Sequence, residues 1–274
     1  METEAEPMQK VIDSFTLTTR HRKPENQDAA FTLSAESAPA DRANMLISCV
    51  MDGVTTANGR EAASITCSIL RSHMLALLSR AQELSITEDP DALQHVILTS
   101  MKNAIMTAHF RLWNQSIKTG STVSLAVVFR DRVFVANVGD SPVYLLRSDL
   151  SGDVWLLELF QNQNRASIRC AAGQIPPEAV RSAPDYHTLV YCLGANLSED
   201  QIFTGQLPLY PNDLLILGSD GALSVLETDT LTDLLDRHRH LGMEHLAQEL
   251  YRQVSRDPQA TDNFTVSLHH LQVC

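Results

Sequence analysis

The sequence predicts an α+β fold in which packed β-sheets are flanked by pairs of α-helices. Strand-like runs arrive in hairpin-like series, helix-like runs arrive in pairs, and no internal repeat or low-complexity linker divides the chain. The chain has 274 residues, of which 44% are hydrophobic and 20% charged, so it can bury one large core. We therefore expect residues 1–274 to form a single domain.

Ten apolar runs are expected to form strands. In the last of them, Phe264, Val266 and Leu268 alternate with polar residues, which predicts a half-buried antiparallel edge strand with His269 in solvent. The uninterrupted run Leu214–Leu217 instead predicts a central strand covered on both faces. The ten runs are Val11–Leu17, Ala29–Leu33, Met45–Met51, Val123–Phe129, Val133–Val138, Val143–Arg147, Val154–Leu159, Thr188–Cys192, Leu214–Leu217 and Phe264–Leu271.

Four segments have helical periodicity. The first runs over about residues 60–80, and the second begins at Asp89-Pro90, an N-cap followed by proline at the first helical position. Apolar residues of the second repeat at three- and four-residue spacing. Two further helices are expected near Thr228–His238 and Met243–Val254. Residues 160–185, rich in Gln, Asn, Arg and Pro, are expected to form an irregular surface flap.

Composition excludes several classes of protein. The net charge of −12 argues against a general nucleic-acid binder, which needs a basic face. No window approaches the roughly 18 uninterrupted apolar residues of a membrane span. The acidic start Met1–Lys10 is unlike a signal peptide, and the five cysteines show no close pairing. We therefore expect a cytoplasmic monomer without a nucleic-acid or membrane partner.

Five short segments each bring an aspartate to a turn beside an apolar run. They are Asn26-Gln27-Asp28, Met51-Asp52-Gly53, Val138-Gly139-Asp140-Ser141, Gly218-Ser219-Asp220-Gly221 and Thr261-Asp262-Asn263. An ionised carboxylate costs several kcal/mol to bury unless it is paired or metal-bound. Hard cations such as Mg²⁺ and Mn²⁺ prefer oxygen ligands of this kind. The set therefore predicts a carboxylate-lined metal centre.

Each segment alone is a weak signal, since an Asp-Gly pair is usually a plain turn. If the strand ends at Asp52, Asp220 and Asp262 lie side by side, however, three carboxylates converge. The tight turn at Gly53 allows its carbonyl to face a cation as well. A two-metal site of this type can activate water and neutralise phosphoryl charge without a Ser, Cys or His nucleophile.

The order of the motifs resembles that of metal-dependent serine/threonine protein phosphatases of type 2C. The motifs that carry the resemblance span about residues 11–271 and are Asn26-Gln27-Asp28, Asp52-Gly53, Gly120-Ser121-Thr122, Val138-Gly139-Asp140-Ser141, Ser219-Asp220-Gly221 and Asp262-Asn263-Phe264-Thr265-Val266. The resemblance implies a four-layer sandwich of two central antiparallel sheets between helix pairs. It also implies hydrolysis of phosphoserine and phosphothreonine in a phosphoprotein substrate.

The same resemblance implies roles for individual residues. Asp52 would bridge two tightly bound Mn²⁺ or Mg²⁺ ions, Asp220 and Asp262 would ligate the first, and the Gly53 carbonyl the second. Asp28 would act through a metal-activated water. Asp140, together with Asp220, would frame a third, weakly bound cation.

The sequence also departs from the family pattern. The arginine that binds substrate phosphate is replaced by Lys23, with Arg22 adjacent, and lysine cannot form the same bidentate contact. The usual glycines and histidine after Asp-Gly are replaced by residues 54–58, and Phe160-Gln161-Asn162 replaces an Asp-His-Ser segment. Either Lys23 or Arg22 is expected to meet the phosphate.

Two alternative functions remain open at this stage. A phosphatase-like binding module with weak or no catalysis would keep the fold, and a hydrolase of small phosphomonoesters would keep the chemistry. Retention of Asp52, Asp220 and Asp262 favours an enzyme, because a scaffold has no need of clustered, unpaired carboxylates.

Overall fold

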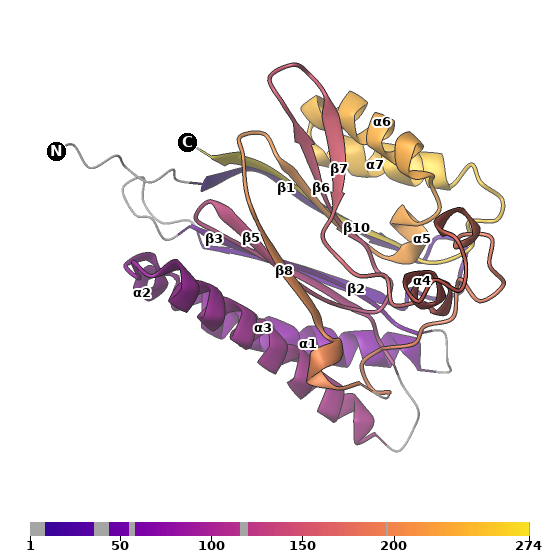
Figure 1. Cartoon of the computed structure of the whole chain (residues 1–274), viewed down its shortest axis with the longest axis horizontal. Helices are drawn as coiled ribbons and strands as arrows, with labels where there is room; N and C mark the ends of the chain where they lie inside the picture. Colours follow the sequence, from indigo (N-terminus) through magenta and orange to yellow (C-terminus); the bar gives the residue numbers. More distant parts are fainter. Residues whose placement is uncertain (1–8, 36–43, 55–57, 116–119, 196, 274) are drawn as a thin grey trace.

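The computed structural model describes residues 9–35, 44–54, 58–115, 120–195 and 197–273. Two antiparallel five-stranded sheets pack face to face, and a pair of helices covers the outer face of each (Figure 1). This four-layer α+β sandwich confirms the predicted fold class. Most of the acidic start and residues 55–57 of the departing segment lie outside the described residues.

The first sheet, sheet I, has the strand order β1-β10-β9-β6-β7. Its strands are β1 (Gln9–Thr19), β10 (Phe264–Val273), β9 (Leu214–Gly218), β6 (Val143–Ser148) and β7 (Val154–Glu158). Strand β9 is central and fully buried, as its continuous apolar sequence predicts. Helices α6 (Thr228–His238) and α7 (Met243–Val254) cover the outer face and share a core with it.

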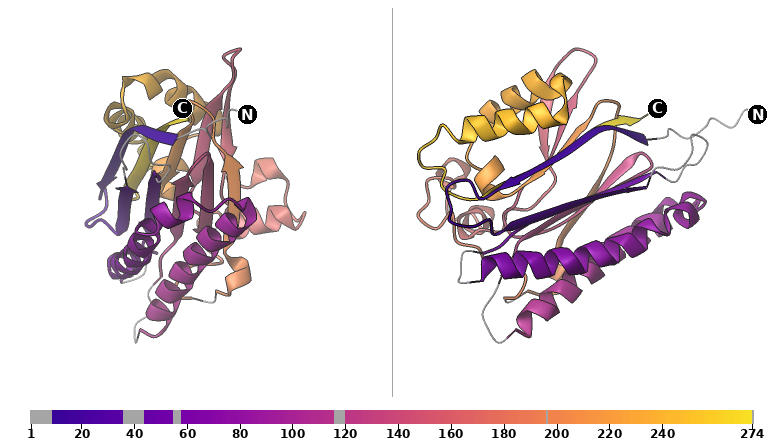
Figure 2. Two further views of the ribbon diagram at one scale, coloured as in Figure 1. Left: turned by 90° about the vertical axis from the view of Figure 1, so that its left-hand side faces the viewer. Right: turned by 180° about the vertical axis from the view of Figure 1, so that it is seen from behind.

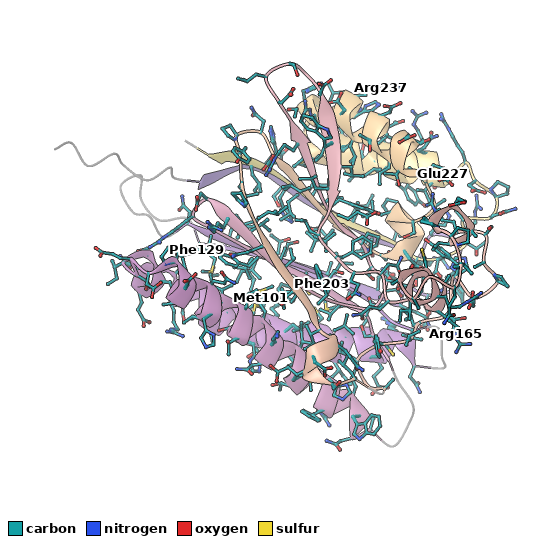
Figure 3. The ribbon with its side chains drawn as sticks, viewed as in Figure 1. Met101, Phe129, Arg165, Phe203, Glu227 and Arg237 are labelled. Atoms are coloured by element: carbon teal, nitrogen blue, oxygen red, sulfur yellow. The ribbon has the colours of Figure 1, made fainter. Side chains whose placement is uncertain are left out.

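The second sheet, sheet II, has the order β2-β3-β4-β5-β8. Its strands are β2 (Asp28–Ala35), β3 (Met45–Asp52), β4 (Val123–Phe129), β5 (Arg132–Val138) and β8 (Phe203–Pro208). Helices α1 (Gly59–Leu78) and α3 (Pro90–Trp113) run along its outer face (Figure 2). Met101 and Phe129, labelled in Figure 3, belong to the core between these two layers.

The start of α3 is determined by its N-terminal residues. The Asp89 side chain accepts hydrogen bonds from the N–H groups of Asp91 and Ala92, and Pro90 opens α3. The shorter elements are α2 (Ala81–Ser85), α4 (Arg165–Ala171) and α5 (Asp220–Leu223), with single-turn 3₁₀ helices η1 (Pro177–Ala179), η2 (Glu199–Gln201) and η3 (Arg239–Leu241). Among the described residues, no helix combines the length and apolar character needed to cross a bilayer.

The last strand corrects one expectation from the sequence. Strand β10 is not an edge strand, because it lies between β1 and β9. Phe264, Val266 and Leu268 share the core with α7, and the buried Thr265, Ser267 and His269 lie on the other face, where Ser267 meets Ser48 of sheet II. His269 is completely buried and hydrogen-bonded to the hydroxyls of Ser14 and Ser267. Polar residues can alternate on a fully buried strand when the opposing layer offers polar partners.

A second correction concerns the segment after the flap. The expected strand Thr188–Cys192 does not form; the backbone there makes only the isolated bridge of Leu189 with Asn164, and Leu193 bridges to Ser121. The edge strand β8 was not expected, since Gly205, Gln206 and a terminal proline obscure its pattern. The flap itself contains the short helix α4, so it is less irregular than its composition indicates.

Candidate metal centre

The five motif aspartates lie at one end of the sandwich, each beside a strand end. Asp28 begins β2 and Asp52 ends β3, and the two are direct cross-strand partners. Asp220 follows β9, and Asp262 precedes β10, the antiparallel neighbour of β9. Asp140 lies in the turn from β5 to β6. Antiparallel pairing thus brings together residues that are up to 234 positions apart in the sequence.

A cleft of about 760 Å³ opens above this end. Its walls include Asp52, Asp140, Asp220 and Asp262, whereas Asp28 lies buried behind them. The rest of the lining comes from Arg181 of the flap, from Tyr186, His187 and Leu189 just after it, and from the segments 224–227 and 257–262. The cleft is therefore acidic at its base and carries the Arg181 guanidinium on its lining.

The acidic base is electrostatically strained. Burial, with repulsion from Asp220 and Asp262, raises the pKa of Asp28 to about 7. Burial, with repulsion from Asp220, raises the pKa of Asp140 to about 8. Burial and then Asp28, Asp220 and Asp140 raise the pKa of Asp52 well above its usual range, and burial and Asp262 raise that of Asp220. Each carboxylate here disfavours ionisation of its neighbours.

Several of the buried carboxylate oxygens have no partner in the described part of the chain. Both oxygens of Asp28 and Oδ1 of Asp220 are buried without a hydrogen bond of ordinary geometry. The hydroxyls of Thr265 and Ser219 lie near enough to Asp28 to lower its pKa slightly, but they do not offset burial. Buried polar atoms in proteins are nearly always satisfied, so unpartnered oxygens indicate a missing ligand.

The donor set fits a hard divalent cation by its chemistry. It consists of oxygen atoms only, comes from several acidic side chains that perturb one another's pKa values, and includes buried oxygens without a hydrogen-bond partner. As the side chains lie, no group of three or more Asp, Glu, His or Cys residues in the described ranges is placed to hold a metal ion. Ionised carboxylates repel one another, so a shell of them closes only around a cation.

Backbone contacts hold the turn of Asp52-Gly53 tightly. A Cβ atom on Gly53 would lie 2.1 Å from the carbonyl oxygen of Gly59 and 2.6 Å from that of Gln27, so only glycine fits. The N–H of Asp52 donates to the Thr122 hydroxyl, which in turn contacts the Ser141 hydroxyl at 2.7 Å. The motif Gly120-Ser121-Thr122 therefore holds the backbone next to Asp52 and Asp140 through the Thr122 hydroxyl.

The Asp140 turn is held from the flap side. Gly139 has a positive φ of 104°, and a Cβ there would meet the Thr122 side chain at 2.7 Å. The buried Gln163 accepts the Gly139 N–H through Oε1 at 2.8 Å and donates through Nε2 to the Gln201 carbonyl. Gln163 follows the Phe160-Gln161-Asn162 segment that departs from the family pattern, and sequence reasoning did not identify it.

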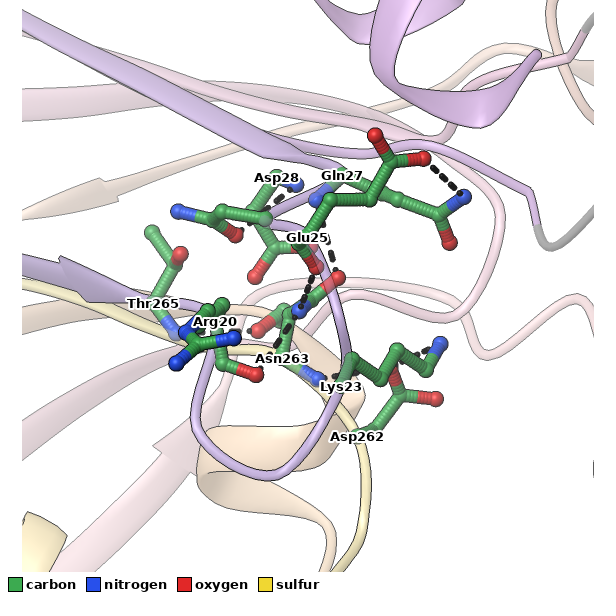
Figure 4. Close-up of polar contacts among 10 residues, drawn as sticks. Arg20, Lys23, Glu25, Gln27, Asp28, Asp262, Asn263 and Thr265 are labelled. Atoms are coloured by element: carbon green, nitrogen blue, oxygen red, sulfur yellow. Dashed lines mark hydrogen bonds and ion pairs between the residues drawn. The ribbon is translucent and has the colours of Figure 1, made fainter.

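Arg22 and Lys23 have different surroundings. The Arg22 guanidinium donates to the backbone carbonyls of Ser255, Asp257 and Ala260, so it clamps two loops together. The Lys23 ammonium forms an ion pair with Asp262 (Figure 4). Of the two candidates for the phosphate contact, Lys23 is the one next to the aspartates.

Asn263 organises this corner of the molecule. Its Oδ1 accepts the Gln27 N–H, and its Nδ2 donates to the carbonyls of Arg20 and Glu25 (Figure 4). The asparagine after Asp262 therefore fixes the β1–β2 loop over the acids. Its place in the motif was visible in the sequence, but nothing local indicated this bridging role.

Ion pairs hold the flap in place, and one of them involves Arg181 of the cleft lining. Arg169 pairs with Asp185, and Arg181 pairs with Glu227 while donating to the carbonyls of Ser224 and Leu226. His187 lies near enough to Asp220 to lower its pKa slightly. The sequence of the flap and of the residues just after it has no periodicity, so it did not predict that Arg181, Tyr186 and His187 would line the cleft.

Comparison with known proteins identifies the family of this chain. The family model described as protein phosphatase 2C matches residues 18–255, so the chain belongs to the protein phosphatase 2C family. The serine/threonine phosphatase stp of Listeria welshimeri is 28% identical over 123 residues, which are 45% of this chain and 46% of that protein. The match therefore spans about half the length of this relative.

Solved structures share the fold at low sequence identity. The serine/threonine phosphatase Stp1 from Staphylococcus aureus has a TM-score of 0.73 and 21% identity, covering 98% of this chain and 99% of its own. The catalytic domain of the serine threonine protein phosphatase PstP, in complex with two manganese ions, has a TM-score of 0.67 and 17% identity, covering 97% and 99%. These likenesses establish the fold.

Proposed function

We propose that the protein is a metal-dependent phosphatase that hydrolyses phosphoserine and phosphothreonine in proteins. The observation that carries this proposal is a set of enclosed aspartates with unpartnered oxygens at the base of an open cleft. Membership of the protein phosphatase 2C family supports it, as does the similarity to a bacterial serine/threonine phosphatase.

Two tightly bound Mn²⁺ or Mg²⁺ ions are the proposed cofactors. Asp52 would bridge them, Asp220 and Asp262 would hold the first, and the Gly53 carbonyl the second. When bound, such ions supply neutralising charge to phosphoryl oxygens and lower the pKa of water. The manganese in the PstP structure, which shares the fold, is consistent with this choice.

The residues of the chain would then do the remaining work. Asp28, enclosed behind Asp52 with both oxygens unpartnered, would orient the attacking water and accept its proton. Lys23 would face the substrate phosphate as a point charge, because Arg22 is occupied by backbone carbonyls. Asp140, opposite Asp220, would support a third and weaker cation.

The remaining assignments concern partners and setting. We propose that residues 1–274 act as one phosphatase domain and as a monomer. The substrate is a phosphoprotein, in cytoplasmic signalling, and the charge of −12 does not favour nucleic acid as a ligand. A binding module without catalysis is not favoured, because it would bear the cost of the aspartate cluster with no benefit.

The test is hydrolysis of a phosphoserine and phosphothreonine peptide panel beside an aryl phosphate, with Mn²⁺ or with excess EDTA. We expect turnover only with metal, preference for the peptides, and resistance to reagents that block serine or cysteine nucleophiles. Full turnover in EDTA would contradict the metal mechanism. Turnover of the aryl phosphate alone would favour small phosphomonoesters as substrates.

A further inference from the structure

The ion pair between Lys23 and Asp262 places a protein cation on a proposed metal ligand. The ammonium contacts Oδ1 of Asp262, and the two side chains are 20% and 39% exposed. The same oxygen accepts the N–H of Asn263 at 2.7 Å. Oδ1 of Asp262 therefore has two donors already, in contrast to Oδ1 of Asp220, which has none in the described residues.

The position of Lys23 is fixed by its loop. The Lys23 N–H donates to the Arg20 carbonyl at 3.0 Å, and that carbonyl also accepts from Asn263 Nδ2. The neighbouring Arg22 is bound to carbonyls of the segment that leads to Asp262. The loop that carries the lysine and the loop that carries the aspartate thus form one unit, so the ion pair is built into the fold (Figure 4).

This arrangement has an electrostatic consequence for metal binding. A unit positive charge on a ligand carboxylate neutralises part of the field that attracts a divalent cation, and it repels that cation directly. In the high effective dielectric of a cleft open to water, repulsion between a unit charge and a divalent cation that would share one carboxylate corresponds to roughly ten-fold in affinity. The same positive charge attracts a substrate phosphate, so its two effects have opposite signs.

We propose that Lys23 is a tethered counter-ion of Asp262 that lowers the affinity of the centre for its divalent cation and raises the affinity for substrate phosphate. This inference rests on the proposed function and deepens it, since it assigns one residue to the control of both metal loading and substrate binding. Lys23 acts here as a positioning residue for Asp262 and as a contact for phosphate.

The first experiment is calorimetric titration of metal-stripped protein with Mn²⁺. Lys23→Met keeps an unbranched side chain of similar length without its charge, so we expect the Kd for Mn²⁺ to fall about ten-fold. Lys102→Met on α3 removes the same charge far from the cleft lining and should leave Kd unchanged. Lys23→Arg retains the charge and should keep the weaker affinity of the original protein.

The second measurement is the KM for a phosphopeptide at saturating Mn²⁺. Lys23→Met should raise KM about ten-fold, while Lys23→Arg should restore it to near the original value. A variant that merely loosened the loop would weaken both metal and phosphate binding. Weaker or unchanged Mn²⁺ affinity in Lys23→Met would therefore overturn the proposal.

A third measurement separates failure of this proposal from failure of the proposed function. In EDTA, Lys23→Met should lower Tm by about 2–4 °C, because Asp262 is left unpaired beside other acids. The double variant Lys23→Met/Asp262→Asn should recover that loss, as a double-mutant cycle requires for two coupled charges. Additive effects with normal Mn²⁺ binding would overturn the counter-ion role and leave the phosphatase assignment in place, whereas absence of Mn²⁺ binding and of turnover in the original protein would overturn the proposed function and the effect on metal affinity that rests on it.

Discussion

Two polar regions lie between the sheets, and they differ in whether their buried groups have partners. One is a row of hydroxyls around one imidazole, which we call the hydroxyl seam; it runs from the exposed Ser14 and Thr32 on the edge strands to the buried Ser48, Ser267 and His269, with the half-buried Thr16 between them. The other is the acid end, comprising Asp28, Asp52, Asp140 and Asp220. Both regions are formed by alternate residues of antiparallel strands and by the turns at their ends.

Partners are complete in the seam and incomplete at the acid end. Ser267 alone contacts the hydroxyls of Thr16 at 2.8 Å and Ser48 at 3.0 Å, and the His269 ring at 3.0 Å. At the acid end, both oxygens of Asp28 lack hydrogen-bond partners among the described residues. A satisfied buried network stabilises a fold, whereas buried groups left without partners cost stability and persist where function needs them. We therefore assign the seam a structural role and propose a functional role for the acid end.

The largest expected effect on activity comes from a substitution at the acid end. Asp52→Asn keeps the size of the side chain but removes the charge that faces both proposed cations. We expect kcat at saturating Mn²⁺ to fall about 1000-fold, about 4 kcal/mol of transition-state stabilisation. Tm in EDTA should rise, because one of several mutually repelling carboxylates is gone.

The control for this comparison is Asp233→Asn, which changes an exposed aspartate on α6. It should alter neither kcat nor Tm. A kcat for Asp52→Asn within three-fold of the original would remove Asp52 from the site, and a lower Tm in EDTA would show that its role is structural.

The sequence predicts those features of the two regions that depend on residues close together in the chain. The carboxylates were found because each follows an apolar run and precedes a turn residue, a pattern contained within a few positions around Asp52 or Asp220. Most strand and helix bounds followed from periodicity in the same way, and α6 and α7 match the expected ranges. Local patterns of this kind predict the secondary structure and the chemistry of a residue, but not its contacts with distant segments.

The features that the sequence did not predict depend on contacts between distant segments. His269 looked like a solvent-facing residue, because nothing near it in the sequence shows that Ser14 and the hydroxyls of sheet II lie opposite. The ion pair of Lys23 joins residues 239 positions apart. The sequence around Tyr186 and His187 has no hydrophobic periodicity, so it could not predict that these residues line the cleft.

The second prediction breaks the hydroxyl seam. Ser267→Ala removes the hydroxyl that Thr16, Ser48 and His269 share, and it leaves the buried Ser48 hydroxyl and His269 ring each short of one partner. We expect the free energy of unfolding to fall by about 2–3 kcal/mol. Urea unfolding measures this, with the exposed Ser68→Ala on α1 as the matched control.

The seam prediction requires that function is spared. At a temperature where Ser267→Ala remains folded, kcat should stay within two- or three-fold of the original, because the Ser267 hydroxyl contacts Thr16, Ser48 and His269 and not the aspartates. A large loss of kcat without loss of stability would mean that the seam takes part in catalysis, and the division between the two regions would not hold.

The third prediction uses the pH dependence of the seam. Burial lowers the pKa of His269 to about 3 from an ordinary value of 6.5, so the unfolded chain binds this proton more readily than the folded protein. Stability therefore falls as pH decreases from about 6.5 towards 3, by about 2 kcal/mol at pH 5. His269→Gln, which keeps hydrogen-bonding capacity but does not titrate, should lack this loss.

The comparison is made by urea unfolding in EDTA at pH 7.5 and pH 5. The difference in unfolding free energy between the original protein and His269→Gln should shift by about 2 kcal/mol in favour of the variant at pH 5. An unchanged difference would mean that His269 titrates alike in the folded and unfolded states, and hence that the seam does not exclude charge.

The smallest expected effect tests how far the acid end extends. Asp140 is only 8% exposed, and burial with repulsion from Asp220 raises the pKa of its carboxyl group to about 8. Its turn is held by backbone contacts through Gly139 and Gln163, so Asp140→Ala should leave the local structure in place. A cation with so few protein ligands is mostly hydrated and weakly bound, and its loss should not disturb a tight pair. We expect kcat to fall about ten-fold, about 1.4 kcal/mol, while the Kd of the tight Mn²⁺ ions measured by calorimetry stays the same. An unaltered kcat would make Asp140 an ordinary turn residue, and a weakened tight Kd would place it among the ligands of the main pair.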